Sequence, residues 1–310
     1  MCIHVKFDIH LAVVASDMAG ILQALHTFAL LQEAPAMQSL ESALNAKAAI
    51  GLDAMDSVAL MDRFDEKFLI PSHWLDDVVR RLTSFSLLRI QGESTTTYNN
   101  RYFDSPTNQC FEDHVRGKSK RFKVRIRHYA NTNVAFLEVK VRDVHGKTVK
   151  HRIVRDAQQG WNADLTETEW RFIREHVGHA VELQPVLESR FERFTLADLA
   201  SGERITVDSQ LQFRSVGDPV EWLQPVPALS IVERKQEHIN HQGPLLQAFR
   251  SQKQRRAPLG RSLRMSKFIL GRMTLTPNLN PRTYRMALRD IERAERFASN
   301  PLLIHNRILK

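Results

Sequence analysis

Hydrophobic and polar residues alternate strictly along several short segments of the chain. Between residues 123 and 129 the even positions Val124 and Ile126 are apolar, while basic side chains fill the positions around them, and residues 138–141 alternate in the same way. A β-strand sends successive side chains to opposite faces. Each segment is therefore predicted to be a strand with one charged and one apolar face. Because the charged face consists mostly of guanidinium and ammonium groups, we expect it to bind a strongly anionic ligand.

The same patterning predicts an α+β fold. Strands are expected at residues 61–70, 98–103, 122–129, 135–142, 148–154, 190–195, 204–213 and 230–235, and helices at 16–50, 72–88, 167–176, 243–251 and 281–300, with Ser72 as a helix N-cap. Antiparallel strands in this number commonly close into a barrel, which removes exposed edges. If the charged faces point inward, the result is an eight-stranded antiparallel β-barrel, a tunnel with a basic lumen and helices packed outside, wide enough for one slim ligand.

The division of the chain follows from these elements. We predict a helical extension over residues 1–47, the tunnel domain over 48–275 and an arginine-rich C-terminal helix over 276–310. Polar residues interrupt the apolar stretches near the N-terminus, so no membrane span is predicted there, and an amphipathic helix or a start at Met37 is favoured over a signal peptide. Cys2 and Cys110 are the only cysteines, which argues against a disulfide framework or a cysteine zinc site and favours a cytoplasmic protein.

Positive charge is concentrated in two regions. The formal net charge is +9, but residues 115–155 contain 13 Lys and Arg against 2 Asp and Glu, and residues 250–310 contain 15 against 3. The remainder of the chain is therefore acidic. Such a distribution indicates a localised anion site rather than general adhesion to polyanions.

The residues on the predicted inner face share period-two spacing. They are Arg63, Asp65, Lys67, Lys123, Arg125, Arg127, Glu138, Lys140, Lys150, Arg152, Arg193, Arg204, Glu233 and Lys235. Cations around a narrow cavity repel one another and are costly to bury uncompensated, but a bound triphosphate would neutralise them. The interleaved carboxylates Asp65, Glu138 and Glu233 are the oxygen ligands that Mg²⁺ or Mn²⁺ would use.

Several segments resemble, in order and spacing, the polyphosphate polymerase domain of the vacuolar transporter chaperone (VTC) family, within the triphosphate tunnel metalloenzyme superfamily. The opening strand Arg63-Phe64-Asp65-Glu66-Lys67-Phe68 is similar to that of the family, and the other matching segments are 102–105, 114–118, 121–127, 136–140, 146–152, 191–193, 203–208, 231–235 and 265–268. The resemblance runs from about residue 50 to 271. It implies a tunnel that binds ATP with Mn²⁺ or Mg²⁺ and transfers the γ-phosphoryl group to a growing polyphosphate chain.

The resemblance also implies roles for individual residues. Catalytic roles fall to Arg125, Arg127, Lys140 and Glu233, and substrate-binding roles to Arg63, Lys67, Lys123, Lys150, Arg152, Arg193, Arg204, Lys235 and Lys267. Glu233 would be the principal metal ligand, helped by Glu138 and Asp65. Members of the family often work beside a membrane protein, so a membrane-protein partner and peripheral membrane association are implied, with no specific nucleic acid.

One departure from the superfamily separates the candidate reactions. Other members often carry Glu-x-Glu-x-Lys on the first strand, where this chain has Arg63-x-Asp65-x-Lys67. A terminal phosphate is already ionised and needs no general base to attack, whereas water must be oriented or activated. The cation-rich sequence therefore favours transfer to phosphate over hydrolysis.

Other interpretations of the same residues stay open. The chain could be a triphosphate hydrolase on this scaffold or a non-catalytic module that binds polyphosphate or inositol phosphates. Glu138 and Glu233 could serve only as salt-bridge partners of Lys140 and Lys235, and the basic strands could form a solvated sheet face. His114, His128 and His151 lack metal-ligand spacing and are expected to be structural. The arginines from 282 to 296 are most simply a solvated helical face, with guidance of a polyphosphate product or contact with anionic lipid or nucleic acid as alternatives.

Overall fold

A computed structural model describes residues 39–56, 64–179, 181–217, 222–251, 262–263, 266–276, 278–279 and 282–299. Its strands are β1 (Ala49–Ile50), β2 (Phe64–Pro71), β3 (Ser86–Leu88), β4 (Thr96–Asp104), β5 (Arg121–Tyr129), β6 (Val134–Arg142), β7 (Thr148–Arg155), β8 (Gln184–Asp198), β9 (Glu203–Arg214) and β10 (Leu229–Gln236). Its α-helices are α2 (Leu75–Arg81), α3 (Gln109–Val115), α4 (Glu167–Val177), α5 (Pro244–Ser251), α6 (Lys267–Leu275) and α7 (Arg285–Ala298). Short 3₁₀ turns lie at Asp53–Asp56, Ser72–Trp74, Ala157–Gln159 and Arg282–Tyr284.

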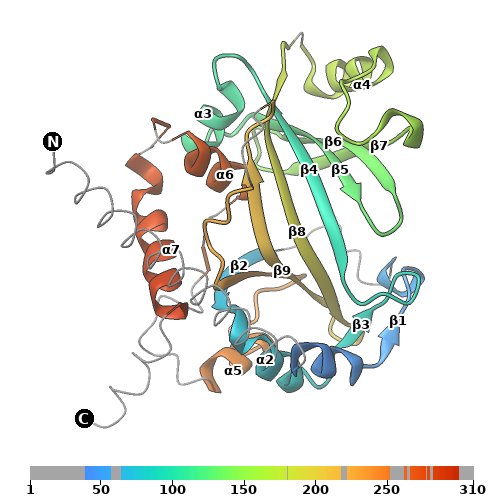
Figure 1. Cartoon of the computed structure of the whole chain (residues 1–310), viewed down its shortest axis with the longest axis vertical. Coiled ribbons are helices and arrows are strands. Elements are labelled where there is room, and N and C mark those ends of the chain that lie inside the picture. The colour runs from blue at the N-terminus through green and yellow to red at the C-terminus, as the bar shows by residue number, and fades with distance from the viewer. Residues whose placement is uncertain are drawn as a thin grey trace, which may run out of the picture.

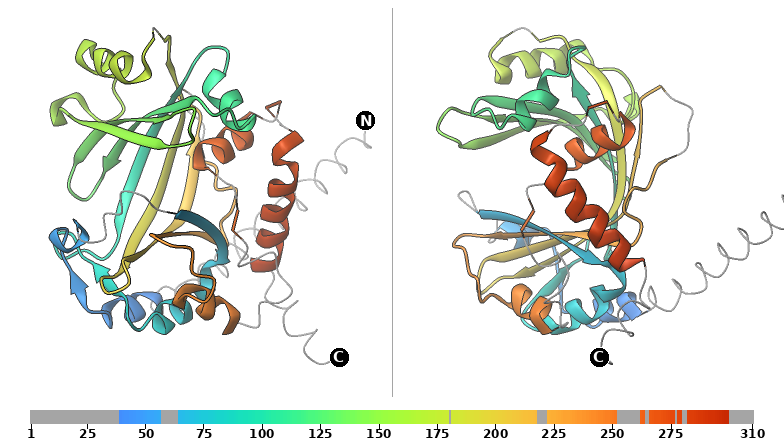
Figure 2. Two further views of the ribbon diagram at one scale, coloured as in Figure 1. Left: turned by 180° about the vertical axis from the view of Figure 1, so that it is seen from behind. Right: turned by 90° about the vertical axis from the view of Figure 1, so that its left-hand side faces the viewer.

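The eight predicted strands are confirmed and form one antiparallel path. Their order is β2-β10-β9-β8-β4-β5-β6-β7, and the short strand β3 joins β8 at one edge and β1 at the other. The sheet is strongly bent, so that β5 to β7, drawn in green, face β2 and β10, drawn in blue and orange (Figures 1 and 2). Among the described strands, β2 and β7 end the path without pairing to each other. The fold is therefore α+β with a large curved antiparallel sheet.

Three helix predictions need correction. The helix expected over 72–88 ends at Arg81, and Ser86–Leu88 instead forms β3, because the buried Leu87 packs in the core while its backbone pairs with β1 and β8. Ser72 is not an N-cap: its hydroxyl hydrogen-bonds the Ser230 hydroxyl at 2.9 Å, and it begins a 3₁₀ turn. The helix expected over 16–50 is present at 39–45 and gives way to β1, while residues before 39 lie outside the described part.

The other helices divide into predicted and unpredicted ones. Helices α4, α5 and α7 fall where the apolar periodicity places them. Helices α3 and α6 were not predicted, since each is short and lies within a stretch without a clear helical period. None of the described helices is both long and apolar enough to cross a lipid bilayer. The predicted domain boundaries at 47 and 275 stay predictions.

Helices cover the apolar outer face of the sheet. Alternate residues of β2, β8, β9 and β10, including Phe68, Leu196 and Val232, pack against α2 and α5 in one cluster that contains Val79 and Phe249. Helix α4 packs on the outer face of β6. This arrangement, apolar outside and charged inside, is the one predicted from the alternation.

Helix α6 differs because it packs against the inner face. A Cβ atom at Gly271 would lie 2.6 Å from Phe213 and 2.8 Å from Leu187 side-chain atoms, and both residues project inward from β9 and β8. Phe268 packs on Tyr102 of β4 with ring centroids 5.5 Å apart. The apolar part of the inner face is therefore covered by α6, and the charged part lies beside the helix N-terminus.

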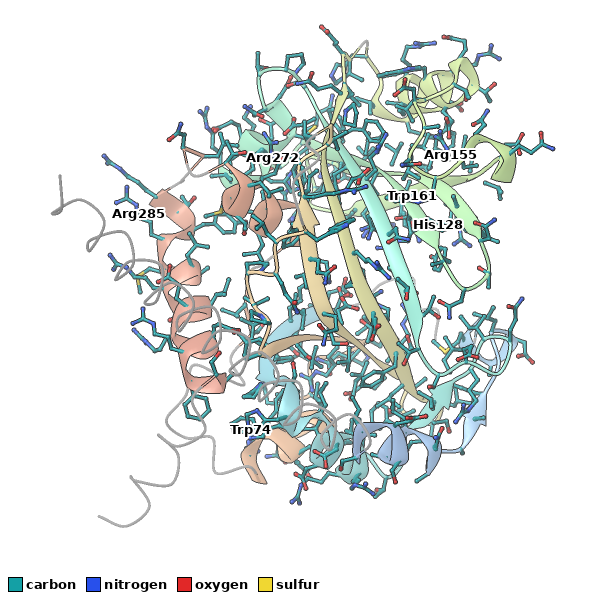
Figure 3. All side chains as sticks on the ribbon, in the orientation of Figure 1. Trp74, His128, Arg155, Trp161, Arg272 and Arg285 are labelled. Carbon is teal, nitrogen blue, oxygen red and sulfur yellow. The ribbon has the colours of Figure 1, made fainter. Side chains whose placement is uncertain are left out.

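Arg155 anchors α4 to the end of β7 (Figure 3). Its fully buried guanidinium donates to both carboxylate oxygens of Glu169 at 2.9 Å and to the carbonyls of Gly160, Ala163 and Asp164. Arg155→Ala is expected to lower the free energy of unfolding by about 3–5 kcal/mol, because it leaves the Glu169 carboxylate buried without its partner. Urea denaturation measures this loss. The exposed Arg171→Ala on the same helix is the control and should change the value by less than about 0.5 kcal/mol; equal effects of both changes would contradict the anchoring role.

Candidate functional site

The strand register places the predicted inner-face residues on one continuous surface. Residues paired directly across antiparallel strands share a face of the sheet. The rows that run across the inner face are Asp65–Lys235–Arg204, Lys67–Glu233–Thr206, Leu69–Ile231–Asp208–Arg193, Asn100–Arg127, Tyr102–Arg125–Glu138–Arg152 and Lys123–Lys140–Lys150. Lys267 joins them from the first position of α6. Arg63 lies outside the described residues.

Charges on strands that are far apart in the sheet path act on one another. Burial and the positive charges of Lys140, Arg125 and Lys67 lower the pKa of Lys123 to about 7. Lys67 lies on β2 and Lys123 on β5, with four strands between them in the path. A flat sheet would place these two strands roughly 24 Å apart, beyond the range of strong electrostatic coupling. The curvature therefore brings cations from strands far apart in the sheet around one shared space.

Lys140 lies in the same electrostatic environment. Burial, Arg125 and Arg127 lower its pKa to about 7, although Glu138 and Glu233 oppose that effect. Since Glu233 belongs to β10 and Lys140 to β6, this influence again crosses the inside of the bent sheet. Two lysines with lowered pKa values thus lie side by side in adjacent strands.

Four carboxylates neutralise part of the positive charge. Glu138 accepts two hydrogen bonds from Arg125 at 2.7 and 2.5 Å, and Lys150 lies 3.6 Å from its other oxygen. Asp208 binds Arg193 at 2.5 and 2.7 Å and also contacts Lys267. Glu233 lies between Lys235 at 3.1 Å and Lys67 at 3.5 Å, and Lys235 reaches Asp65 at 3.4 Å. Lys140 is not an ion-pair partner of Glu138, so that alternative from the sequence is wrong, whereas the Lys235–Glu233 pair exists.

Of the predicted site cations that are at least half-buried, Arg127, Lys123 and Lys140 form no ion pair with any described residue. Arg127 donates from Nε to the Asn100 side chain at 3.2 Å and lies 5.3 Å above the Tyr98 ring. Lys123 donates to the Ser266 hydroxyl at 3.1 Å. Lys140 lies beside them in the lysine row. These uncompensated charges make the inner face complementary to an anion.

An aromatic layer supports the arginines. Tyr98 stacks on Phe191 with ring centroids 5.3 Å apart, and the Arg193 guanidinium lies 5.0 Å from Tyr98 and 5.3 Å from Phe191. Lys267 lies 4.5 Å from the Phe191 ring, and Arg125 5.9 Å from the Tyr102 ring. Cation–π contacts hold charged groups in place without neutralising them. The arginines are therefore positioned before any ligand arrives.

The inner carboxylates are held in their ionised form. Burial alone would raise the pKa of Glu138, but Arg125, Arg127 and Lys150 lower it well below its usual range. At Glu233, Lys235 and Lys67 likewise lower the pKa by more than burial raises it. At Asp208, Arg193 and Lys267 lower the pKa in the same way. These groups are bases too weak to remove a proton from water at neutral pH.

No group of three or more potential metal-binding side chains occurs among the described residues. Asp65, Glu138 and Glu233 therefore do not form a preformed three-carboxylate site. Glu138 nevertheless keeps one buried oxygen, Oε1, without a hydrogen-bond partner in the described part. Mg²⁺ commonly binds through one or two carboxylates together with substrate phosphates and water, and Glu138 and Glu233 fit that pattern.

The predicted site residues differ in their exposure to solvent. Asp65 is exposed, and so are Lys150 and Arg152 on the open-edge strand β7. The remaining described inner-face residues are buried or half-buried, and Arg125 and Arg193 expose only 16% and 13% of their side chains. A fully solvated sheet face is therefore excluded for β5, β8 and β10.

The three histidines have structural contacts. On the outer face, His128 stacks on Trp161 with ring centroids 5.8 Å apart (both residues are labelled in Figure 3), and His151 stacks on His176 of α4. Half-buried His114 hydrogen-bonds the Cys110 carbonyl oxygen. Their predicted structural roles agree with these contacts.

Asp208 is the functional candidate that the sequence interpretation missed. It is 1% exposed and connects an arginine of β8 to a lysine of α6. The alternation Arg204, Thr206, Asp208 along β9 carried the signal, since period two places all three on one face. Tyr98, Asn100 and Tyr102 on β4 follow the same rule.

Asp208→Asn is expected to lower the free energy of unfolding by about 3 kcal/mol, because Arg193 and Lys267 would then be buried without a counter-charge. Thermal denaturation at neutral pH measures the loss. Thr206→Val, two residues earlier on the same face, is the control and should be nearly neutral because the Thr206 hydroxyl has no hydrogen-bond partner among the described residues. A stable Asp208→Asn protein would show that the two cations do not depend on this carboxylate.

Comparisons with solved structures return distant similarities. A Hippeastrum protein described as an adenylyl cyclase with a dominant triphosphatase activity is 17% identical, with a TM-score of 0.45 over 69% of this chain and 97% of that one. A protein from Bacillus halodurans suggested to be an adenylate cyclase is 11% identical, with a TM-score of 0.41 over 66% of this chain and 94% of that one. The PH1819 protein from Pyrococcus horikoshii is 13% identical, with a TM-score of 0.36 over 67% and 97%.

The sequence was also compared with curated proteins and with models of protein families. No curated protein matches the chain. The family model described as the VTC domain matches residues 62–276, which include β2 to β10 and α6. That match covers more than half of the sequence and agrees with the residues that carried the resemblance. The chain belongs to the VTC domain family.

Proposed function

We propose that the protein is a metal-dependent polyphosphate polymerase that transfers the γ-phosphoryl group of ATP to the end of a polyphosphate chain. The observation that carries this proposal is a group of inner-face cations, Arg127, Lys123 and Lys140, that form no ion pair with the part of the chain that the structure describes. Membership of the VTC domain family supports the same substrate class.

The inner-face chemistry suits transfer to phosphate. Phosphoryl transfer depends mainly on positioning and on neutralising charge on the transferring group. Arg127 keeps guanidinium N–H groups that form no hydrogen bond with described residues, and a planar fork of this kind matches phosphate oxygens in pairs. The ionised carboxylates beside it are poor bases, which disfavours activation of water. An ionised phosphate needs no such base.

The remaining inner-face residues receive supporting roles. Arg125 and Arg193, each fixed by a carboxylate, would bind further phosphates, as would Lys67, Lys150, Arg152, Arg204, Lys235 and Lys267. Glu233, with Glu138 as its helper, would hold Mg²⁺ or Mn²⁺ together with phosphate oxygens. When bound, the metal ion would neutralise charge that develops on the phosphates.

The lowered pKa values of Lys123 and Lys140 predict proton uptake on binding. Both lysines have a pKa of about 7 without ligand, and a bound polyanion raises that value because it stabilises the charged form. Affinity for tripolyphosphate should therefore be highest below pH 7 and fall as the pH rises above it, by up to about one decade per unit for each lysine.

Titration calorimetry in two buffers with different ionisation enthalpies measures this uptake at pH 8. Lys123→Arg keeps the charge permanently and should remove its share of the protons, since arginine stays protonated. Affinity that is constant from pH 6.5 to 8.5, after correction for ligand ionisation, would contradict the assignment.

The direct test of the proposed activity is incubation of the purified protein with ATP and Mn²⁺ or Mg²⁺, followed by gel electrophoresis. A ladder of long phosphate chains, formed together with ADP, is the expected result. Free phosphate without chains would show a triphosphate hydrolase instead. Binding of ATP or polyphosphate without turnover under either metal would show a non-catalytic binding module.

A further inference from the structure

The rows of cations on the inner face continue past Lys123 and Lys140 to a pair of arginines. Arg121 and Arg142 pair directly across β5 and β6, next to the Lys123–Lys140 row and on the same face. Neither forms an ion pair with a described residue. Arg121 donates to the Lys118 carbonyl, and the buried Nε of Arg142 has no hydrogen-bond partner in the described part. Two adjacent arginines without an anion are unfavourable unless something anionic binds there.

Helix α7 begins beside this arginine pair. Thr283, in the turn that precedes α7, donates to the carbonyl of Val115 at the end of α3 at 3.4 Å. Burial and Arg142 lower the pKa of Arg121, while Tyr284 at the same turn opposes that effect. Figure 3 places the labelled Arg285 at this end of α7, directed away from the body of the protein. The inner face and the N-terminus of α7 are therefore adjacent.

Four exposed arginines continue along α7. Arg285, Arg289, Arg293 and Arg296 follow helical spacing, so they form one stripe roughly 17 Å long. The opposite face of the helix, with Ile291, Ala294 and Ala298, is buried against the protein.

The arginine stripe is weakly neutralised. Arg293 and Arg296 reach Asp290 and Glu292 only at 3.8 Å in exposed pairs, which contribute little. Arg285 and Arg289 form no ion pair with described residues. A shallow depression of about 460 Å³ is lined by Arg289, Glu292, Arg293 and Arg296.

We propose that Arg121, Arg142 and the α7 stripe of Arg285, Arg289, Arg293 and Arg296 form a track that binds the polyphosphate chain outside the catalytic site. This inference rests on the proposed function, because it takes the inner face as the site where the chain is extended. The track would hold the part of a long chain that has left the transfer site and would raise affinity for long chains over short ones through additional phosphate contacts.

The shape of the track favours a linear polyanion over a membrane surface. The apolar side of α7 is buried in the protein, so the helix cannot insert into a lipid interface. Of the apolar residues on its exposed side, only Met286 is strongly exposed, at 66%. A single row of arginines that begins beside the inner face matches one extended chain of phosphates.

The test compares tripolyphosphate with long-chain polyphosphate in binding to the full-length protein. Two double variants remove charge from the track: Arg289→Gln with Arg293→Gln, and Arg121→Gln with Arg142→Gln. The matched control, Arg171→Gln with Arg174→Gln, removes the same charge from exposed positions on α4. Affinities are measured across a range of salt concentrations.

Each track variant is expected to bind long chains about tenfold more weakly, with the slope of log affinity against log salt reduced by roughly one per arginine. Tripolyphosphate binding and the control variant should match the unmodified protein. Unchanged long-chain affinity, or equal weakening of both ligands, would overturn the track. Loss of binding to phosphatidylserine vesicles with unchanged polyphosphate affinity would overturn it in favour of a membrane surface. If the unmodified protein binds neither phosphate ligand, the proposed function itself fails.

Discussion

Replacing Arg127 by alanine is expected to reduce the rate of chain formation from ATP by about a thousandfold, because one charge-stabilising group on the transferring phosphoryl is removed. Among the arginines of the proposed transfer site, Arg127 is the best suited to this role, since it is half-buried and has no carboxylate partner among the described residues. Its side chain donates a 3.2 Å hydrogen bond to Asn100 and lies over the Tyr98 ring. Rates of ADP release and product chains on a gel measure the loss.

The same change should leave the fold intact. Arg127→Ala removes the favourable contacts with Asn100 and Tyr98, but it also removes the electrostatic repulsion between Arg127 and the two lysines Lys140 and Lys150. These effects oppose each other, so the free energy of unfolding should change by less than about 1 kcal/mol. Arg125→Ala is the contrasting variant: it strips Glu138 of its buried partner and should cost about 3 kcal/mol of stability as well as activity. Undiminished turnover in Arg127→Ala would remove this arginine from the site.

Glu233→Gln is expected to lower chain formation by about a hundredfold to a thousandfold and to raise the metal concentration needed for half-maximal rate. The substitution keeps the size of the side chain but removes the charge that a divalent ion requires. The protein should stay folded, because Lys235 keeps its contact with Asp65 at 3.4 Å and the Lys67 side chain remains 32% exposed. Activity measured against Mn²⁺ concentration gives both parameters.

Asp65→Asn provides the matched control for Glu233→Gln. It removes the same charge beside the same lysine, but Asp65 is exposed where Glu233 is half-buried within the cation rows. Asp65→Asn should therefore retain most of the activity, in contrast to the ligand role that the family resemblance implies for Asp65. Identical metal dependence in both variants would show that Glu233 has no special part in binding the ion.

The sequence predicted most of the sheet because its signal is local. Alternation over eight or nine residues, as in Arg121–Tyr129, fixes both the strand and the face on which each side chain lies. Short helices and strands were less predictable from the sequence. Ser86–Leu88 joined the sheet through pairing with strands distant in sequence, which local periodicity cannot reveal. Helix α6 likewise depends on inner-face contacts with Phe213 and Leu187.

The cations of the site could be predicted from the sequence, whereas the carboxylates that neutralise them were harder to predict. Period two placed Arg125, Arg127 and Lys140 on one face, and the register brings them together. Which carboxylate neutralises which cation depends on the curvature of the sheet and on the position of α6. That is why the contacts of Asp208, and the lack of a carboxylate partner for Arg127 among the described residues, appear only in three dimensions.

A crystal structure of the protein grown with tripolyphosphate and Mn²⁺ tests the central claim most directly. Phosphates within hydrogen-bonding distance of Arg127 on β5, Arg193 on β8 and Lys267 on α6 at once would show that cations from separate elements bind one shared polyanion. Phosphates bound only on the outer surface, with the inner-face cations contacting none of them, would contradict it.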